Sequence, residues 1–213
     1  MLNLIYPFNT LYIKNWSTYT IYSICWENNY SSCHSKSPTD TVYGIGCKIR
    51  DLDGIERIYN IKHRPKEKPL ACLCASLEQI KEIAEVDKVS EALIHKFLPG
   101  GFTLILKSKR EIHNLIGYPT IGVRIPNHKI ALDILKENGP MLTTSVNESG
   151  AVPLNEYDEI VKEYEGMVDK IYDTNTESMN KPSTVVLITD GCVKILREGP
   201  VSKEEIEHFL KEI

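Results

Sequence analysis

Hydroxyl and carboxyl groups are concentrated in residues 38–46, which have the sequence PTDTVYGIG. Two threonines, an aspartate and a tyrosine follow a proline, which restricts φ, and two glycines free the backbone towards the end of the stretch. Such a segment can hold hydroxyl groups against a ligand while its backbone approaches that ligand closely. The pattern also fits an ordinary strand-to-loop junction, so its meaning depends on the segments that follow.

Positive charge is concentrated in residues 62–70, which have the sequence KHRPKEKPL. Lys62, Arg64, Lys66 and Lys68 fall within seven residues, and the two prolines keep the segment extended and stiff. Cations on a rigid loop suit the phosphates of a nucleotide. A solvated basic loop on the surface is the alternative interpretation, which this segment alone would favour.

Polar residues also interrupt three apolar segments. Arg124 lies inside the run TIGVRIP at residues 120–126, where an arginine is costly to bury unless the protein or a ligand supplies a carboxylate or phosphate partner. Hydroxyls and an amide gather in TTSVNESG at residues 143–150, where a strand is expected to leave the sheet and where ligands bind in open α/β sheets. The third segment is KPSTVV at residues 181–186, considered with Arg197, and it also fits plain strand residues.

Several common catalytic motifs are missing from the sequence. It has no GxSxG elbow, no GxxxxGK[ST] loop, no strand–GxGxxG–helix unit and no HExxH pair. If the protein uses ATP, it does so without a Walker loop. Cys25 and Cys33 with His34 match no standard zinc spacing, so the six cysteines are interpreted as reduced and mostly buried thiols, and no metal site is expected.

Strands and helices alternate from residue 38 onward, which predicts an α/β domain. The dipeptide Asp190-Gly191 indicates a hairpin between residues 183–189 and 192–198, so the sheet is expected to be mixed rather than purely parallel. The other expected strands are residues 42–49, 70–74, 102–106, 121–125, 141–145 and 168–172. The residues expected to begin helices are Asp53, Ser76, Asp87, Asn127, Asn155 and Ser202.

The overall composition is ordinary for a globular protein, with 42% hydrophobic and 25% charged residues in a chain of 213. A net charge of −4 argues against a protein held to nucleic acid by bulk charge. No run approaches the roughly 18 apolar residues of a spanning helix, and the N-terminus lacks the pattern of a signal peptide. We therefore expect no association with a membrane and a cytoplasmic location.

Residues 1–37 differ in kind from the rest of the chain. They are rich in Tyr, Asn, Ser, Thr and Ile, and they show no helical period, although residues 19–22 (YTIY) have strand propensity. We expect residues 1–37 to be an atypical segment and residues 38–213 to form the domain.

Taken together, these motifs resemble the YrdC family of threonylcarbamoyl-AMP synthases. The matching stretches are PTDTVYGIG, KHRPKEKPL, PGGFTLIL, TIGVRIP, TTSVNESG, PSTVV and LREGP, in this order within residues 37–200. The resemblance implies a YrdC-like α/β fold, a twisted mixed β-sheet with flanking helices and a concave basic cleft. It also implies that L-threonine, bicarbonate and ATP, which carries Mg²⁺, give threonylcarbamoyl-adenylate and pyrophosphate. A separate transferase would then use this product to make threonylcarbamoyladenosine on tRNA.

The resemblance further implies roles for individual residues. The catalytic positions are Lys62, Arg64, Ser145 and Asn147. The ATP-binding positions are Arg64, Lys68, Thr120, Ser145 and Arg197, and the threonine-binding positions are Thr41, Arg124, Thr143 and Ser183. The chemistry fits such residues, because carbamate formation and adenylation need positioning and charge stabilisation rather than a protein nucleophile.

The sequence also departs from the YrdC pattern. The usual Pro-Gly-Pro is Pro-Gly-Gly at residues 99–101, Ser-Ala-Asn is Ser-Val-Asn at 145–147, and Leu73 stands in the region where some members have a histidine. Members usually carry an amphipathic helix, a Gly-Gly and an apolar strand before PTDTVYG. Residues 1–37 show none of these, which favours an upstream reading-frame error over a divergent start.

A YciO-like RNA-binding protein of unclear or no catalytic role is the alternative within the same superfamily. The stretches at residues 46–49, 73–74 and 140–142 resemble that branch, which tends to lose the Lys-x-Arg and Ser-x-Asn residues. This chain keeps both pairs, so we favour the synthase. The alternative predicts salt-sensitive binding to tRNA or double-stranded RNA.

Overall fold

The computed structural model describes residues 20–23, 43–147, 149–151, 154, 156–171, 182–189 and 191–213, with the backbone alone for residues 20–23. The predictions that concern Cys25, Cys33, His34, Thr41, Asn155, Lys181 and Asp190 therefore lie outside the described residues. Among the helices that are described, none has the length and apolar character needed to cross a membrane.

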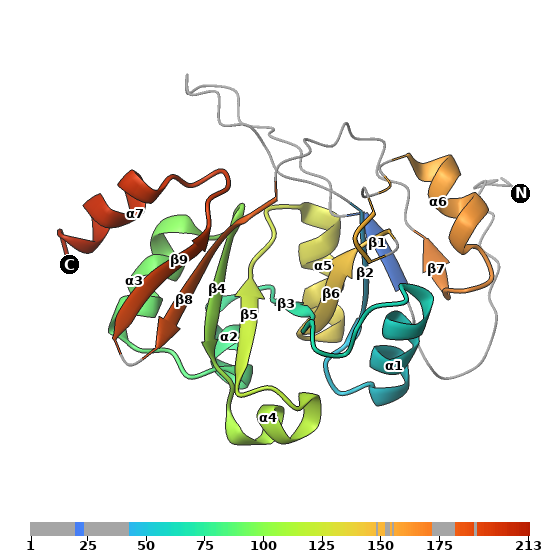
Figure 1. The fold of residues 1–213 in the computed structure, drawn as a ribbon, viewed down its shortest axis with the longest axis horizontal. Helices are drawn as coiled ribbons and strands as arrows, with labels where there is room; N and C mark the ends of the chain where they lie inside the picture. The colour runs from blue at the N-terminus through green and yellow to red at the C-terminus, as the bar shows by residue number, and fades with distance from the viewer. Residues whose placement is uncertain are drawn as a thin grey trace, which may run out of the picture.

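The described strands form one mixed sheet in the order β7-β1-β2-β6-β3-β5-β4-β8-β9, which is strongly twisted (Figure 1). The strands are β1 (Thr20–Ser23), β2 (Tyr43–Lys48), β3 (Ala71–Leu73), β4 (Phe102–Lys107), β5 (Thr120–Arg124), β6 (Met141–Ser145), β7 (Lys170–Ile171), β8 (Thr184–Thr189) and β9 (Cys192–Arg197). Pairs β1–β7, β3–β5 and β4–β8 are parallel, and the other five pairs are antiparallel. The predictions of a mixed sheet, of its strands and of the β8–β9 hairpin are confirmed.

Residues 1–37 contribute the strand β1 to this sheet. It runs antiparallel to β2, with Thr20 opposite Gly46 and Ser23 opposite Tyr43. The strand propensity noted at residues 19–22 is confirmed by this pairing. On its other side β1 is parallel to β7, so it joins β7 to the rest of the sheet.

Seven helices lie among the described residues. They are α1 (Leu52–Ile61), α2 (Leu77–Ile83), α3 (Lys88–Phe97), α4 (Arg110–Ile116), α5 (Lys129–Asn138), α6 (Tyr157–Tyr164) and α7 (Lys203–Leu210). Ser76, Asp87 and Ser202 cap α2, α3 and α7 as predicted, each accepting a hydrogen bond from the backbone N–H three residues later.

Two predicted helix starts need correction. The cap of α1 is Asp51, whose Oδ1 accepts from the Gly54 N–H at 2.9 Å, so Asp53 lies inside the first turn, where its charge still favours the helix dipole. The cap of α5 is His128 instead of Asn127, because His128 Nδ1 accepts from the Ala131 N–H. Helix α6 begins at Tyr157 after Glu156, and the residue predicted to begin it, Asn155, lies outside the described residues.

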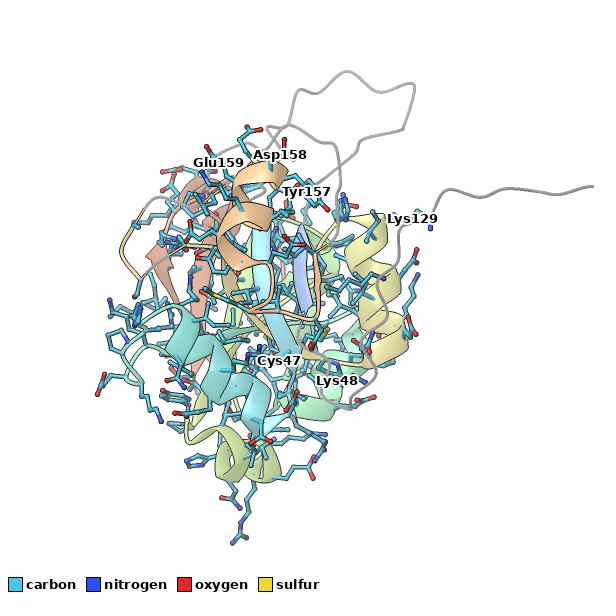
Figure 2. All side chains as sticks on the ribbon, turned by 90° about the vertical axis from the view of Figure 1, so that its right-hand side faces the viewer. Cys47, Lys48, Lys129, Tyr157, Asp158 and Glu159 are labelled. Carbon is cyan, nitrogen blue, oxygen red and sulfur yellow. The ribbon has the colours of Figure 1, made fainter. Side chains whose placement is uncertain are left out.

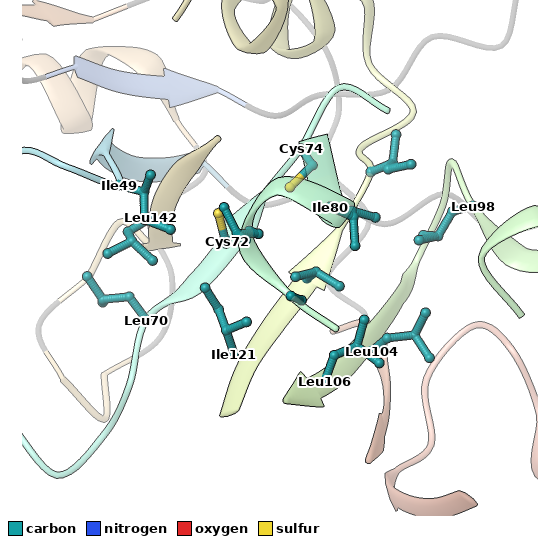
Figure 3. Packing of buried hydrophobic residues seen from close by; sticks show 14 of the residues in the cluster. Ile49, Leu70, Cys72, Cys74, Ile80, Leu98, Leu104, Leu106, Ile121 and Leu142 are labelled. Atoms are coloured by element: carbon teal, nitrogen blue, oxygen red, sulfur yellow. The ribbon is translucent and has the colours of Figure 1, made fainter. Parts of the chain in front are cut away.

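Alternation along the strands divides the sheet into two faces. The core face carries apolar side chains that are almost completely buried, including Ile45 and Val123. Figure 3 shows two further members of this cluster, Cys72 and Leu104. Helices α1, α2, α3, α4, α6 and α7 all contribute buried residues to this one cluster. The main hydrophobic core therefore lies on one side of the sheet.

The opposite side, which we call the site face, carries Gly46, Ala71, Gly122 and Thr143. Helix α5 packs on it at one end, where a smaller apolar cluster forms from Leu73, Ala131, Ile134, Leu135 and Met141. In Figure 2 the strands β1 and β2 lie between α1 and α5, so these helices cover opposite faces of this part of the sheet. The site face is thus only partly covered by the described helices.

The described cysteines are free thiols. Cys47, Cys72 and Cys74 are buried in the core and Cys192 is exposed. Burial, helped by the charge of Asp51, raises the pKa of Cys47 to about 12, so this thiol is unreactive at neutral pH. The prediction of reduced and mostly buried thiols is confirmed for these four residues.

Candidate active site

Strand register brings the predicted site residues onto the site face. Ser145 lies opposite Gly44, Thr143 lies opposite both Gly46 and Ala71, and Arg124 lies opposite Leu73. Directly paired residues point to the same side of a sheet, and so do residues two apart in one strand. Thr120, Arg124, Thr143 and Ser145 therefore share one face, although they come from two strands that are not neighbours.

The centre of the site face has a floor of small residues. A Cβ atom on Gly46 would lie 2.9 Å from Thr143 Oγ1 and 3.0 Å from the Leu142 carbonyl oxygen, so a larger residue does not fit there without a shift. A Cβ atom on Gly122 would lie 3.6 Å from Thr103 Cγ2 and 3.9 Å from the Ala71 Cβ. Because these residues are small, a ligand bound on the site face can approach the strand backbone closely.

The most tightly connected part of the candidate site is a buried cation. Lys62 follows the last turn of α1, and only 1% of it is exposed. Its ammonium donates to the carbonyl oxygens of Ser145 and Asn147 and, at 3.0 Å, to Asn147 Oδ1. An ammonium group has three protons, so these acceptors match its full capacity. The Lys-x-Arg and Ser-x-Asn segments, more than 80 residues apart, thus meet at one charge.

Hydrogen bonds fix the loop that receives this cation. Ser145 Oγ donates to Asn147 Oδ1 at 2.6 Å, and Asn147 Nδ2 donates to the Ala151 carbonyl oxygen at 2.7 Å. The Ser149 N–H donates a hydrogen bond to the Lys62 carbonyl oxygen at 3.0 Å. Lys62 and Asn147 are both buried, and the hydrogen bonds between them and to the backbone satisfy a buried charge and a buried amide together.

Burial also changes the acidity of Lys62. Removal from water, and secondly the charge of Arg64, lower the pKa of Lys62 from 10.5 to about 8. The side chain therefore remains mostly protonated at pH 7 but can lose its proton at mildly alkaline pH. At neutral pH it supplies a fixed positive charge beside Ser145 and Asn147.

Arg64 and Lys68 lie in a loop beside this cation. Arg64 donates from Nε to the Lys68 carbonyl oxygen at 2.9 Å and from Nη2 to the Pro69 carbonyl oxygen at 3.0 Å. The Lys68 side chain is exposed, and its N–H closes a turn onto the Pro65 carbonyl oxygen. The extended, stiff loop that the two prolines predict therefore contains a turn and is braced by its own arginine.

A second polar cluster lies where β4 and β8 run side by side. Ser183 Oγ is 2.8 Å from Thr103 Oγ1, and Arg197 donates to the Ser183 carbonyl oxygen at 3.0 Å and to Ser183 Oγ at 3.3 Å. Thr103 was not predicted to belong to the site. The alternation of side chains along residues 102–106 could have indicated it, because Thr103 is a polar residue between apolar neighbours.

The structure brings most of the predicted residues together, but in two groups. Thr120 and Ser145 lie towards the end of the sheet that borders the basic loop, since β3 follows that loop directly. Arg124 lies about 13 Å along β5 from Thr120, and its Nε donates to the Gly100 carbonyl oxygen at 2.8 Å. Arg197 belongs with Ser183 and Thr103 rather than with Thr120.

Comparison with known proteins gives a consistent result. Residues 36–199 match the Sua5/YciO/YrdC family model, which is described as "Telomere recombination". The putative threonylcarbamoyl-AMP synthase of Methanocaldococcus jannaschii is 36% identical over 167 residues, which cover 78% of this chain and 80% of that protein.

Two solved structures share the fold. Pyrococcus abyssi Sua5 complexed with L-threonine has a TM-score of 0.74 and 33% identity, covering 83% of this chain and 53% of that one. Escherichia coli YciO has a TM-score of 0.73 and 30% identity, covering 89% of this chain and 87% of that one. The chain thus spans about half the length of the P. abyssi protein and most of the length of the E. coli protein.

Proposed function

The chain belongs to the Sua5/YciO/YrdC family, and we propose that it is an L-threonylcarbamoyladenylate synthase. In this reaction the threonine amine joins bicarbonate to form a carbamate with loss of water. A carbamate oxygen then attacks the α-phosphate of ATP, which forms the mixed anhydride threonylcarbamoyl-AMP and releases pyrophosphate. By its chemistry this enzyme is a nucleotidyltransferase.

The observation that carries the proposal is the contact of Lys62 with Ser145 and Asn147. A buried, hydrogen-bonded cation beside a hydroxyl and an amide suits a reaction in which charge moves between carboxylate and phosphate oxygens. All three donors of Lys62 are used by the loop, so in this arrangement it acts by holding Ser145 and Asn147 and by its charge. The YciO-like branch tends to lose these residues, which favours the synthase over a non-catalytic role.

The two polar groups on the site face suggest where each substrate binds. We assign the ATP phosphates to Arg64 and Lys68 at the basic loop, with Thr120 and Ser145 beside them. Threonine then lies over the floor at Thr143, with Arg124 and Ser183 at its far side and Thr41 supplying a further hydroxyl. Arg197, placed next to Ser183, would reach ATP from the threonine side. Together these groups would form the concave basic cleft.

Mg²⁺ enters this scheme with ATP. Among the described residues no group of three or more His, Cys, Asp or Glu side chains is placed to hold a metal ion. The phosphates of ATP are themselves ligands that Mg²⁺ prefers. When bound, the ion would neutralise charge on the phosphates and on the departing pyrophosphate.

The product determines the partners. Threonylcarbamoyl-AMP is a reactive mixed anhydride, so an enzyme that transfers the threonylcarbamoyl group must take it up before water does. We propose a tRNA-modifying transferase as that enzyme, in the cytoplasm. Direct binding of tRNA or double-stranded RNA is the property that the YciO-like alternative requires.

The decisive test is pyrophosphate release from ATP that depends on both threonine and bicarbonate. We expect Lys62→Ala and Arg64→Ala each to reduce this rate by a factor on the order of 10² or more. Lys203→Ala is the matched control, because Lys203 lies on α7 in an exposed ion pair with Glu207. Release that is unaffected by omitting threonine, from a chain that melts cooperatively, would overturn the proposal.

RNA binding is tested separately by titrating labelled tRNA at low and at physiological salt. The alternative predicts tight binding at low salt that weakens steeply as salt rises. Salt-sensitive RNA binding without threonine-dependent pyrophosphate release would favour the YciO-like role.

A further inference from the structure

Two tyrosine hydroxyls hold the basic loop by its backbone. Tyr59 on α1 donates to the Lys68 carbonyl oxygen at 3.0 Å, and the hydroxyl of Tyr118, just before β5, donates to the Lys66 carbonyl oxygen. The two tyrosines come from segments almost 60 residues apart, yet they hold alternate carbonyl groups of one loop. The position of this loop therefore depends on hydrogen bonds from other segments of the chain as well as on its own turn.

Tyr59 and Arg64 share an acceptor. The Lys68 carbonyl oxygen accepts from the Tyr59 hydroxyl and, at 2.9 Å, from Arg64 Nε, while Arg64 Nη2 binds the next carbonyl oxygen, that of Pro69. Two donors match the two lone pairs of a carbonyl oxygen. The two bonds of Arg64 use two of its five N–H groups, so the guanidinium is oriented and still has donors for an anion.

Packing beside the loop is incomplete, so the two tyrosine hydroxyls matter more for its position. A cavity of about 150 Å³ lies at this place, with Ile55, Leu70, Ile116 and Leu142 among its lining residues. Tyr59, Lys66 and Tyr118 also line it. Because side chains do not fill this space, the hydrogen bonds from the two tyrosines contribute more to the position of the loop beside it.

The Tyr59 hydroxyl is suited to a constant role. Tyr59 is only 7% exposed, and its ring belongs to the main core cluster. Burial, and then the neighbouring Tyr118, raise the pKa of Tyr59 well above its usual value, so the hydroxyl remains a donor at any working pH.

We infer that Tyr59 is a positioning residue for ATP binding, which it supports by fixing the Lys68 carbonyl oxygen that in turn orients Arg64. The inference rests on the proposed function, because it takes the phosphates of ATP as the anion that Arg64 binds. Tyr118 supports the same loop through Lys66, whose carbonyl oxygen has no hydrogen bond from Arg64 among those found in the described residues, and its contribution is therefore smaller.

Calorimetric titration of ATP, without threonine, tests this inference directly. We expect Tyr59→Phe to raise the Kd for ATP about five-fold and Tyr118→Phe about two-fold, since each loses one hydrogen bond that reaches the anion indirectly. Glu56→Gln is the control: Glu56 lies on the same helix and forms an exposed ion pair with Lys66, and its loss leaves the carbonyl bonds intact. The Kd for ATP of this variant should not change.

A second comparison separates positioning from general loosening of the fold. In an Arg64→Lys background, where no fork can bind two carbonyl groups, Tyr59→Phe should add less than two-fold to the Kd. In the intact enzyme the KM for ATP should rise with Tyr59→Phe while kcat and the KM for threonine stay close to those of the unchanged chain. A purely structural role would instead change all three and would persist in the Arg64→Lys background.

The outcomes are distinct. If the unchanged chain binds no ATP, the proposed function fails and this inference fails with it. If the unchanged chain binds ATP and Tyr59→Phe has the same Kd, the inference alone is overturned. If thermal melting shows Tyr59→Phe to be unfolded, Tyr118→Phe decides: a raised Kd supports the holding of the loop by the tyrosines, and an unchanged Kd overturns it.

Discussion

The two faces of one sheet have opposite compositions. On the core face, residues such as Ile45, Leu104 and Val123 are large, apolar and almost fully buried under six helices. On the site face, their strand neighbours Gly46, Thr103 and Gly122 are small or polar. The same strands therefore place the hydrophobic stabilisation of the fold on one side and the groups suited to chemistry on the other.

One end of the site face differs from the rest, because it is apolar and covered by a helix. Helix α5 covers one end of it through Leu73, Ala131 and Met141. Leu73 lies directly opposite Arg124, so apolar packing ends one strand away from a charged group. We conclude that α5 borders the candidate site and closes one end of the site face.

The sharpest test of the comparison uses two adjacent residues of β4. Leu104 is completely buried on the core face and Ile105 is half-buried on the site face. We expect Leu104→Ala to lower the free energy of unfolding by about 3 kcal/mol, because it leaves a cavity in the core. Ile105→Ala should cost about 1 kcal/mol, because its side chain is already partly in water. Urea denaturation measures both, and equal losses would contradict the division into two faces.

Lys62 is a buried cation that joins the end of α1 to Ser145 and Asn147. Its lowered pKa predicts the direction in which the stability of the fold changes with pH. Its pKa falls from 10.5 to about 8 on folding, so between these values the unfolded chain holds a proton that the folded chain has lost. The free energy of unfolding should therefore rise with pH across this window, and the full cost of the buried charge applies below pH 8.

Lys62→Met removes this titration while keeping most of the side-chain volume. The stability of the unchanged chain relative to Lys62→Met should increase between pH 8 and pH 10.5 by an amount on the order of 2 kcal/mol. Denaturation of both chains at several pH values gives the difference, in which the other titrating groups cancel. A difference that does not vary with pH would mean that Lys62 keeps an ordinary pKa.

Much of the fold follows from local sequence signals, and the errors are local too. In DLDG and the residues after it, both Asp51 and Asp53 have a backbone N–H to bind three residues later, so spacing does not decide between them. The structure selects Asp51 because α1 starts at Leu52. At α5 the cap is His128, a less usual capping residue. The helix begins at Lys129, so Asn127, which directly follows Pro126, lies one residue too early in the chain to cap it. Such choices depend on how the preceding strand ends rather than on the helix itself.

The candidate site is less accessible from sequence because it depends on strand order. Alternation alone places Thr120, Gly122 and Arg124 on one side of their strand. It does not reveal that β3 lies between β5 and β6, which sets Thr143 and Ala71 side by side on the same face. The contact of Lys62 with Asn147 joins segments 85 residues apart, and no local pattern predicts it.

The polar cluster on the site face should affect substrate binding more than stability. Ser183→Ala removes the hydroxyl that meets Thr103 Oγ1 and Arg197 Nη2. We expect the KM for threonine to rise about ten-fold, which corresponds to about 1.4 kcal/mol, with a loss of stability below about 1 kcal/mol. Thr189→Val at the exposed end of β8 is the control and should leave the KM unchanged. A Ser183→Ala chain that loses stability but keeps its KM would move this cluster from the site to the fold.

The smallest expected effect concerns the cap of α5, which borders the site face. His128 is buried, and its Nδ1 accepts from the Ala131 N–H, so only the neutral ring can cap the helix. Burial lowers the pKa of His128 below its ordinary value of 6.5. The stability that it contributes is therefore complete above pH 6.5 and is lost as the pH falls through the lower folded value.

His128→Asn keeps a capping side chain without a titrating group. Between pH 7 and pH 5 the unchanged chain should lose up to about 1 kcal/mol relative to His128→Asn, and the other histidines, common to both chains, cancel in the comparison. Parallel loss of stability in the two chains would show that this cap does not depend on protonation.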